Sequence, residues 1–185
     1  MNKVPVVLIS GDDDVLISRS LNEYVEKALG DEDKSLALEE LTEENYRSSE
    51  QFHISKLVDS AQTAPFLTQS RVVVGRHMGR FSKKDDLEPL VEYLNSPLET
   101  TSLILVWEKG NNPQQQRLSP VPKSLLEAIE NSGGILEKLT TGKGKQAEKW
   151  LGEALEKAPV ELNREARKHI TGHFGEDRTK VFALL

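Results

Sequence analysis

The sequence predicts an α/β protein, with a three-layer domain built on a five-stranded parallel sheet and a small all-α domain after it. Five short runs of apolar or alternating residues are separated by segments whose apolar residues recur at helical spacing. This alternation is typical of a parallel sheet with right-handed crossovers. Beyond residue 141 no further strand pattern follows. We therefore expect one domain over residues 1–141 and a second over residues 142–185.

The first strand is predicted over Val4–Ser10 (VPVVLIS), a β-branched run of the kind buried on both faces of a sheet. Gly11 ends it, and Asp12–Asp14 supply the cap and first-turn acids of a helix that closes at Gly30. The other strands are predicted over Leu36–Leu41, Arg71–Val74, Ser102–Trp107 and Ile135–Leu139. The other helices of this domain are predicted over Ser49–Ser60, Lys83–Leu94 and Lys123–Glu130, with a polar loop over Gly110–Pro120.

The composition changes at Thr140–Lys145 (TTGKGK), which we interpret as a flexible basic linker. Its glycines and lysines also suggest a phosphate loop, but the segment follows the last strand and lacks the leading glycine and the closing serine or threonine. Helices are predicted after it over Lys145–Glu156, Asn163–Gly172 and Glu176–Leu185, with Pro159, Gly172 and Gly175 as breaks.

Composition limits the possible functions. The chain has 185 residues and a net charge of −6, so it is no general nucleic-acid binder, and any contact with DNA must be local. It has no cysteine, which excludes disulfides, thiolate catalysis and cysteine-bound zinc. The apolar run at the N-terminus is too short for a signal peptide or a membrane span. We expect a soluble, cytoplasmic protein that does not bind membranes.

The first turn of the sheet is the usual place for a phosphate-binding loop. Here it reads Ser10–Val15 (SGDDDV), with one glycine, no lysine and three aspartates that would repel a triphosphate. The acid that would hold magnesium is also missing from the third strand, which ends in Val74–Arg76, and the fourth offers only Glu108. An active nucleotide hydrolase of this fold class is kept as an alternative, although these residues disfavour it.

A receiver-like signalling module is a second alternative, with Asp12–Asp14 as a magnesium cluster. It would need an aspartate at the tip of the third strand and a lysine after the fifth. The third strand ends in valine and glycine, and Lys138 lies inside the fifth. Helix capping explains the aspartates more simply.

Two further groups are possible sites. His169 and His173 are four residues apart and could share a helix face, but they lack a third ligand. Arg71, Arg76, His77 and Arg80 form a modest basic group that could touch DNA phosphate or pair with nearby acids. We find no nucleophile, base and orienting acid, and we expect no cofactor, no metal and no catalysis by this chain.

The most informative stretch is Thr63–Arg71 (TAPFLTQSR), where Phe66 and Leu67 follow a proline and precede polar residues. Adjacent residues cannot both face one core in a regular helix or strand. One interpretation is an exposed apolar pair that fills a partner's pocket. The other is that both side chains pack a helix end against the sheet.

The order of these features resembles the delta-subunit family of the bacterial DNA polymerase III clamp loader. The matching segments are Leu8–Asp14 as a degenerate phosphate loop, Pro65–Val74 (PFLTQSRVVV), the strand Leu103–Trp107 and the three-helix second domain. The resemblance implies an AAA+-like domain followed by a helical lid. It covers the family's first two domains, and we expect that the helical collar domain of the family is absent from this chain.

What the resemblance implies about function is specific. The family's delta subunit does not hydrolyse ATP; it belongs to the DNA polymerase III holoenzyme, a DNA-directed DNA polymerase and nucleotidyltransferase. By resemblance, Phe66 and Leu67 match the pair that enters the hydrophobic pocket of the sliding clamp, while the surrounding helix wedges one clamp interface open. The expected partners are the clamp, the other loader subunits through the collar, and DNA in the assembled loader. Here the pair is phenylalanine followed by leucine, which leaves open the order in which the two side chains fill the clamp pocket.

Overall fold

The computed structural model describes residues 6–11, 13–49, 51–81, 83–110, 118–139, 151–152, 155–156, 162–174 and 181. The chain divides into two compact units. One comprises Met1–Asp12 and Leu16–Leu139, and the other comprises Asp13–Val15 and Thr140–Leu185.

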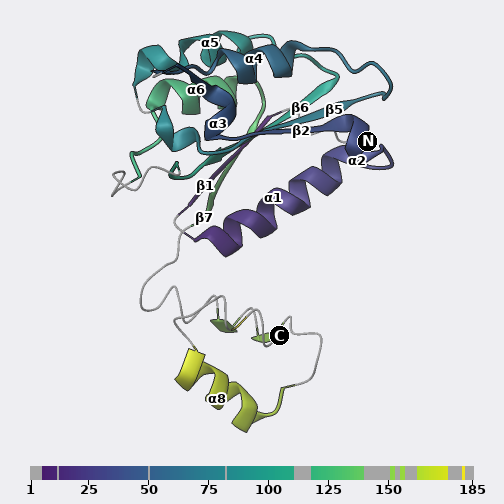
Figure 1. The fold of residues 1–185 in the computed structure, drawn as a ribbon. Coiled ribbons are helices and arrows are strands. Elements are labelled where there is room, and N and C mark those ends of the chain that lie inside the picture. The colour runs from purple at the N-terminus through teal and green to yellow at the C-terminus, as the bar shows by residue number, and fades with distance from the viewer. Residues whose placement is uncertain are drawn as a thin grey trace. The chain divides into compact units, whose positions relative to one another are not determined.

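The first unit is built on a five-stranded sheet (Figure 1). Its strands are β1 (Val6–Gly11), β2 (Leu38–Leu41), β5 (Arg71–Gly75), β6 (Thr101–Trp107) and β7 (Ile135–Leu139). They lie in the order β2-β5-β6-β1-β7 and every neighbouring pair is parallel. The predicted fold class is confirmed. Because all five strands point the same way, their N-terminal ends share one edge of the sheet and their C-terminal ends share the other.

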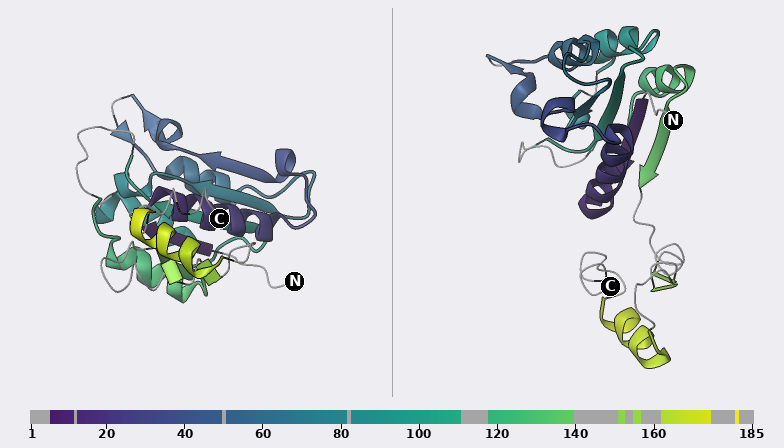
Figure 2. Two further views of the ribbon diagram at one scale, coloured as in Figure 1. Left: turned by 90° about the horizontal axis from the view of Figure 1, so that it is seen from below. Right: turned by 90° about the vertical axis from the view of Figure 1, so that its right-hand side faces the viewer.

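Helices cover both faces of the sheet (Figure 2). Helix α1 (Asp14–Leu29) packs on one face, and its predicted end is confirmed by Gly30, which adopts a φ of 57°. Helices α4 (Ser55–Gln62), α5 (Lys84–Leu94) and α6 (Lys123–Asn131) pack on the other face. Each of these three buries one apolar stripe, which is how a sequence with helical periodicity becomes a layer over a sheet.

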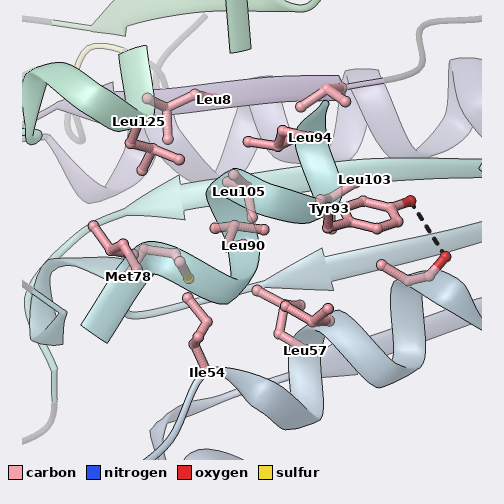
Figure 3. Close-up of a cluster of buried hydrophobic side chains, with 14 of the residues drawn as sticks. Leu8, Ile54, Leu57, Met78, Leu90, Tyr93, Leu94, Leu103, Leu105 and Leu125 are labelled. Carbon is pink, nitrogen blue, oxygen red and sulfur yellow. Dashed lines mark hydrogen bonds between the residues drawn. The ribbon is translucent and has the colours of Figure 1, made fainter. Parts of the chain in front are cut away.

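Figure 3 shows the core between the sheet and these three helices. Leu57 of α4, Leu90 of α5 and Leu125 of α6 are fully buried against the strands. The hydroxyl of Tyr93 donates a hydrogen bond to the carbonyl of Ala61 at 3.3 Å, and so joins α5 to the last turn of α4. This bond fixes the point at which the chain leaves α4.

Two predicted elements are wrong in part. Leu36 was expected in a strand but lies in the short helix α2 (Lys34–Ala37), and β2 begins only at Leu38. The cause is local, since the carboxylate of Asp33 accepts hydrogen bonds from the amide of Ser35 at 2.8 Å and from its hydroxyl at 2.7 Å. This N-cap starts a helical turn in a segment whose alternation favoured a strand.

The helix predicted from Ser49 begins six residues later, at Ser55. Helix α3 (Glu43–Tyr46) and a hairpin of β3 (Arg47–Ser48) and β4 (Gln51–Phe52) come before it. Thr42 and Asn45 form a capping box that starts α3, and Ser49 turns the hairpin with a φ of 57°. A 3-10 turn, η1 (Met78–Arg80), follows β5.

In the second unit the structure describes α8 (Arg164–Phe174) and a small apolar cluster of Leu151, Leu155, Ile170 and Val181. Gly172 was expected to end the helix, but α8 continues through it to Phe174. The linker predicted over Thr140–Lys145 lies outside the described residues, as do Asp12, most of the loop Gly110–Pro120 and most of the helices predicted over Lys145–Glu156 and Glu176–Leu185.

Candidate functional site

The candidate site is the irregular loop of residues 63–70, which leaves α4 and enters β5 at the N-terminal edge of the sheet. Phe66 has an exposed fraction of 93% and Leu67 one of 70%. The structure therefore supports the interpretation in which the pair is exposed and contradicts the one in which it packs against the sheet. The expectation of a surrounding helix is wrong, because α4 ends at Gln62.

The end of α4 fixes the first side of this loop. The amide of Thr63 donates to the carbonyl of Ser60 at 3.3 Å, and its hydroxyl donates to the carbonyl of Asp59 at 2.7 Å. Pro65 follows two residues later, and the residue before a proline is driven out of helical conformation. The helix therefore stops before Phe66 instead of carrying that side chain into the core.

An ion pair fixes the other side of the loop. Arg71, the first residue of β5, binds the carboxylate of Glu39 on the neighbouring strand β2, and the hydroxyl of Ser60 donates to the same carboxylate. The backbone amide of Arg71 also donates to the carbonyl of Thr100 at 2.9 Å. Burial pushes the pKa of Glu39 upward, but the hydrogen bonds from Ser60 and Arg71 and the charge of Arg71 outweigh it, so the pKa lies below its ordinary value.

Two further hydrogen bonds hold the centre of the loop. The amide of Gln69 donates to a carboxylate oxygen of Glu32, in the turn after α1, at 2.8 Å. The hydroxyl of Thr68 donates to the carbonyl of Ser70 at 2.9 Å. The loop is thus held to α4, to β2 and to the turn after α1. A loop held in this way presents its apolar pair with little conformational entropy left to lose on binding.

Chemically, the exposed pair offers apolar surface for binding a partner. Burying each of the two side chains against a partner would contribute roughly 1.5–3 kcal/mol. Sequence reasoning found Phe66 and Leu67 because adjacent large apolar residues after a proline are unusual. It missed Glu39 and Glu32 as anchors, since their roles depend on which strands and turns are neighbours.

The opposite edge of the sheet, where ligands bind in open α/β folds, is occupied by an ion pair. Arg76 follows β5 and Glu108 follows β6, and the two side chains meet through bonds of 2.6 Å (Nε to Oε1) and 2.9 Å (Nη2 to Oε2). The amide of His77 also donates to Glu108 at 3.3 Å. The hydrogen bonds that Arg76 donates to Glu108 raise the pKa of Arg76 above its ordinary value. The acid suspected as a metal ligand therefore already has a cationic partner.

The first turn of the sheet does not have the dimensions of a phosphate loop. Only two residues separate the end of β1 at Gly11 from the start of α1 at Asp14. Asp13 accepts a hydrogen bond from the amide of Val15 at 3.0 Å, which is the capping role expected of it. The sheet order also contradicts the receiver alternative, since receiver domains place the first strand between the second and third.

The remaining candidate groups have local explanations. The basic group lies against acids: Arg71 meets Glu39, Arg76 and His77 meet Glu108, and Arg80 lies 3.5 Å from Glu43. The rings of His169 and His173 stack with their centroids 4.2 Å apart. Among the described residues, no three acidic or histidine side chains are grouped as a metal site would require. In that same part of the chain no helix is both long and apolar enough to cross a membrane.

The parallel sheet and the helices on both of its faces define a class, a three-layer α/β domain. A model of the family "DNA polymerase III, delta subunit" matches residues 8–131, and the chain belongs to this family. A search of curated proteins finds no match.

Solved structures that are similar to the chain include the following two. The Bacillus subtilis DNA clamp loader delta protein matches with a TM-score of 0.67 at 17% identity, over 98% of this chain and 53% of its own. A DNA polymerase III gamma subunit-related protein from Thermotoga maritima matches with a TM-score of 0.50 at 14% identity, over 98% and 52%. At these identities the likeness shows the fold. The chain spans about half the length of the structures that it matches.

Proposed function

We propose that this chain is a non-catalytic part of a DNA polymerase III clamp loader and that it binds and opens the sliding clamp during DNA replication. The observation that carries the proposal is the exposure of Phe66 and Leu67, side by side on a loop that is held at both ends. Membership of the delta-subunit family supports it. In this proposal residues 1–141 form the AAA+-like domain with a degenerate nucleotide site, and residues 142–185 form its lid.

The location of the pair favours a protein partner over a small ligand. It lies at the N-terminal edge of the sheet, away from the edge at which open α/β folds bind cofactors. It projects from the loop, whereas small-molecule sites are concave. A projecting apolar pair on an acidic protein suits a partner that offers an apolar pocket. We propose that the sliding clamp offers this pocket.

Opening the ring requires that the chain bind the open clamp more tightly than the closed one. A rigid block can do this, because a clamp that deforms to fit it gains contacts that the closed ring does not offer. Each tenfold preference for the open form shifts the equilibrium by about 1.4 kcal/mol. No nucleotide chemistry in this chain is needed for that shift, and the Arg76–Glu108 pair is consistent with its absence. ATP use would belong to other loader subunits, and DNA contact to the assembled loader.

Clamp binding is tested with a Phe66→Ala, Leu67→Ala double variant. Two truncated contacts of roughly 1.5–3 kcal/mol each predict that clamp affinity falls about 100-fold or more. The matched control is Ile135→Ala, Leu136→Ala, which removes two exposed apolar side chains from the edge strand β7. This control should bind like the wild type. Equal retention of the clamp by the double variant and the wild type would remove the assignment.

Clamp opening needs a separate measurement. A closed ring stays on circular DNA, whereas an opened ring can leave it. We expect the wild-type chain to release clamps from a nicked circle faster than they leave unaided, and the double variant to release them no faster than buffer does. The single variants Phe66→Ala and Leu67→Ala would show which side chain carries more of the effect.

A further inference from the structure

A third apolar side chain is exposed at the same edge of the sheet. Five large apolar residues are exposed in the described part of the chain. Ile135 and Leu136, at 38% and 37%, lie on β7, which is on the other side of the sheet from β2 and β5 in the strand order. The three most exposed are Phe66, Leu67 and Leu36, and the exposed fraction of Leu36 is 56%.

Leu36 lies beside the loop that carries the pair. In the register of β2 and β5, Leu38 pairs with Val72, so Leu36 and Ser70 each lie two residues before a paired position. The hydrogen bond from Gln69 to Glu32 joins the loop to the turn that leads into α2. Figure 1 places α2 at the end of the sheet where the chain enters β5.

The exposure of Leu36 follows from how α2 is built. The N-cap bonds from Ser35 to Asp33 fix where the helix starts, and its last residue, Ala37, is the one buried in the core. Leu36 precedes Ala37 and lies on a different side of the turn. Nothing in the fold of this unit requires a large apolar residue there, because Leu36 belongs to neither core cluster of the first unit.

We propose that Leu36 is a third apolar contact with the partner that receives Phe66 and Leu67, so that the binding surface extends from the loop onto α2. This inference rests on the proposed function. The turn before α2 carries Asp31, Glu32 and Asp33 in succession. The partner surface is therefore an apolar patch next to the main pocket, with basic side chains facing the acidic turn.

The first test measures clamp affinity for Leu36→Ala. Alanine is the best helix former, so α2 should be retained, and far-UV circular dichroism checks this. Removing the part of the Leu36 side chain that the partner would bury predicts binding that is about five- to thirtyfold weaker. Leu136→Ala, the control on β7, should bind like the wild type. Wild-type affinity in Leu36→Ala would overturn the inference.

The double variant of Phe66 and Leu67 in the same assay separates the two proposals. If it binds like the wild type, the proposed function fails, whereas if only Leu36→Ala binds like the wild type, this inference fails alone. The second test compares Leu36→Lys with Leu36→Glu, which differ in the sign of the added charge. A basic partner surface predicts that Leu36→Lys binds several-fold more weakly than Leu36→Glu. Equal affinities, or the reverse order, would overturn the basic character assigned to the partner.

Discussion

Arg76 and Glu108 form the ion pair with the largest expected energetic effect among the described residues. Glu108 is only 8% exposed and accepts two hydrogen bonds from Arg76, whereas the similarly buried Glu43 lies 3.5 Å from Arg80. Arg76→Ala would leave this carboxylate buried without its partner. We expect a loss of roughly 2–4 kcal/mol in the free energy of unfolding, somewhat below a fully buried pair because part of Arg76 reaches solvent. Urea denaturation measures it.

The control for this prediction is Lys123→Ala, which breaks the exposed pair that Lys123 makes with Glu127 at 3.1 Å. Exposed pairs contribute about 0–1 kcal/mol. A loss of the same small size in both variants would show that the Arg76–Glu108 pair does not stabilise the C-terminal edge of the sheet.

Glu39 predicts a pH dependence. Its pKa lies below the ordinary value of 4.5 in the folded protein, because the contacts with Ser60 and Arg71 outweigh burial. A depressed pKa contributes stability that is present above the unfolded value and lost as the pH falls through the folded one. As the pH falls below about 4.5, Glu39→Gln should therefore lose less stability than the wild type, in denaturation curves recorded at each pH.

The exposed residue Glu26 supplies the comparison, because Glu26→Gln is the same chemical change and leaves the contacts of Glu39 in place. If the free energies of unfolding of Glu39→Gln and the wild type decreased in parallel through this range, the contacts of Glu39 would contribute nothing to folding.

At the scale of elements, the hairpin of β3 and β4 turns at Ser49, whose φ of 57° lies in the left-handed region. The left-handed region costs a residue with a side chain about 1–2 kcal/mol. Glycine avoids this cost, but it loses more conformational entropy on folding, which offsets part of the gain. We expect Ser49→Gly to raise the free energy of unfolding by about 0.5 kcal/mol, measured from the urea midpoint. Ser48→Gly, one residue earlier in β3, should lower it instead. A decrease in both variants would contradict the account of the turn.

The long apolar elements could be predicted from the sequence, and the short ones could not. The strand Thr101–Trp107 and the helix Lys84–Leu94 follow from continuous or periodic apolar patterns, and the structure confirms them. The helices α2 and α3 depend on caps at Asp33 and Thr42, which compete with the apolar pattern over only four residues. The hairpin depends on one left-handed residue that is neither glycine nor asparagine, so no turn signal marks it.

At the scale of the whole molecule, the ion pair at the C-terminal edge of the sheet predicts how the chain responds to nucleotide. A ligand that binds only the folded state raises its stability by an amount set by its concentration relative to Kd. With about 1 mM Mg-ATP, we expect the melting temperature to stay within roughly 1 °C of its value in buffer. A rise of several degrees would instead support the alternative of an active nucleotide hydrolase.

The candidate site could be predicted only in part, because some of its residues are far apart in the sequence and meet only through the order of the strands. Phe66 and Leu67 are adjacent in sequence, so their unusual chemistry is visible there. Leu36 lies thirty positions away from them, and Glu39 meets Arg71 only because β2 and β5 are neighbours. No pattern within a short window specifies that neighbourhood, since it follows from the order of strands in the sheet.

The two edges of the sheet have a consequence for how this protein can change over time. Arg76 and Glu108, which hold the domain together, follow the C-terminal ends of β5 and β6, whereas the exposed side chains lie at the N-terminal edge. Substitutions of Phe66, Leu67 or Leu36 should therefore alter recognition with little penalty in folding. During evolution, substitutions at these positions could change the affinity for a co-evolving partner while the fold of the domain stays the same.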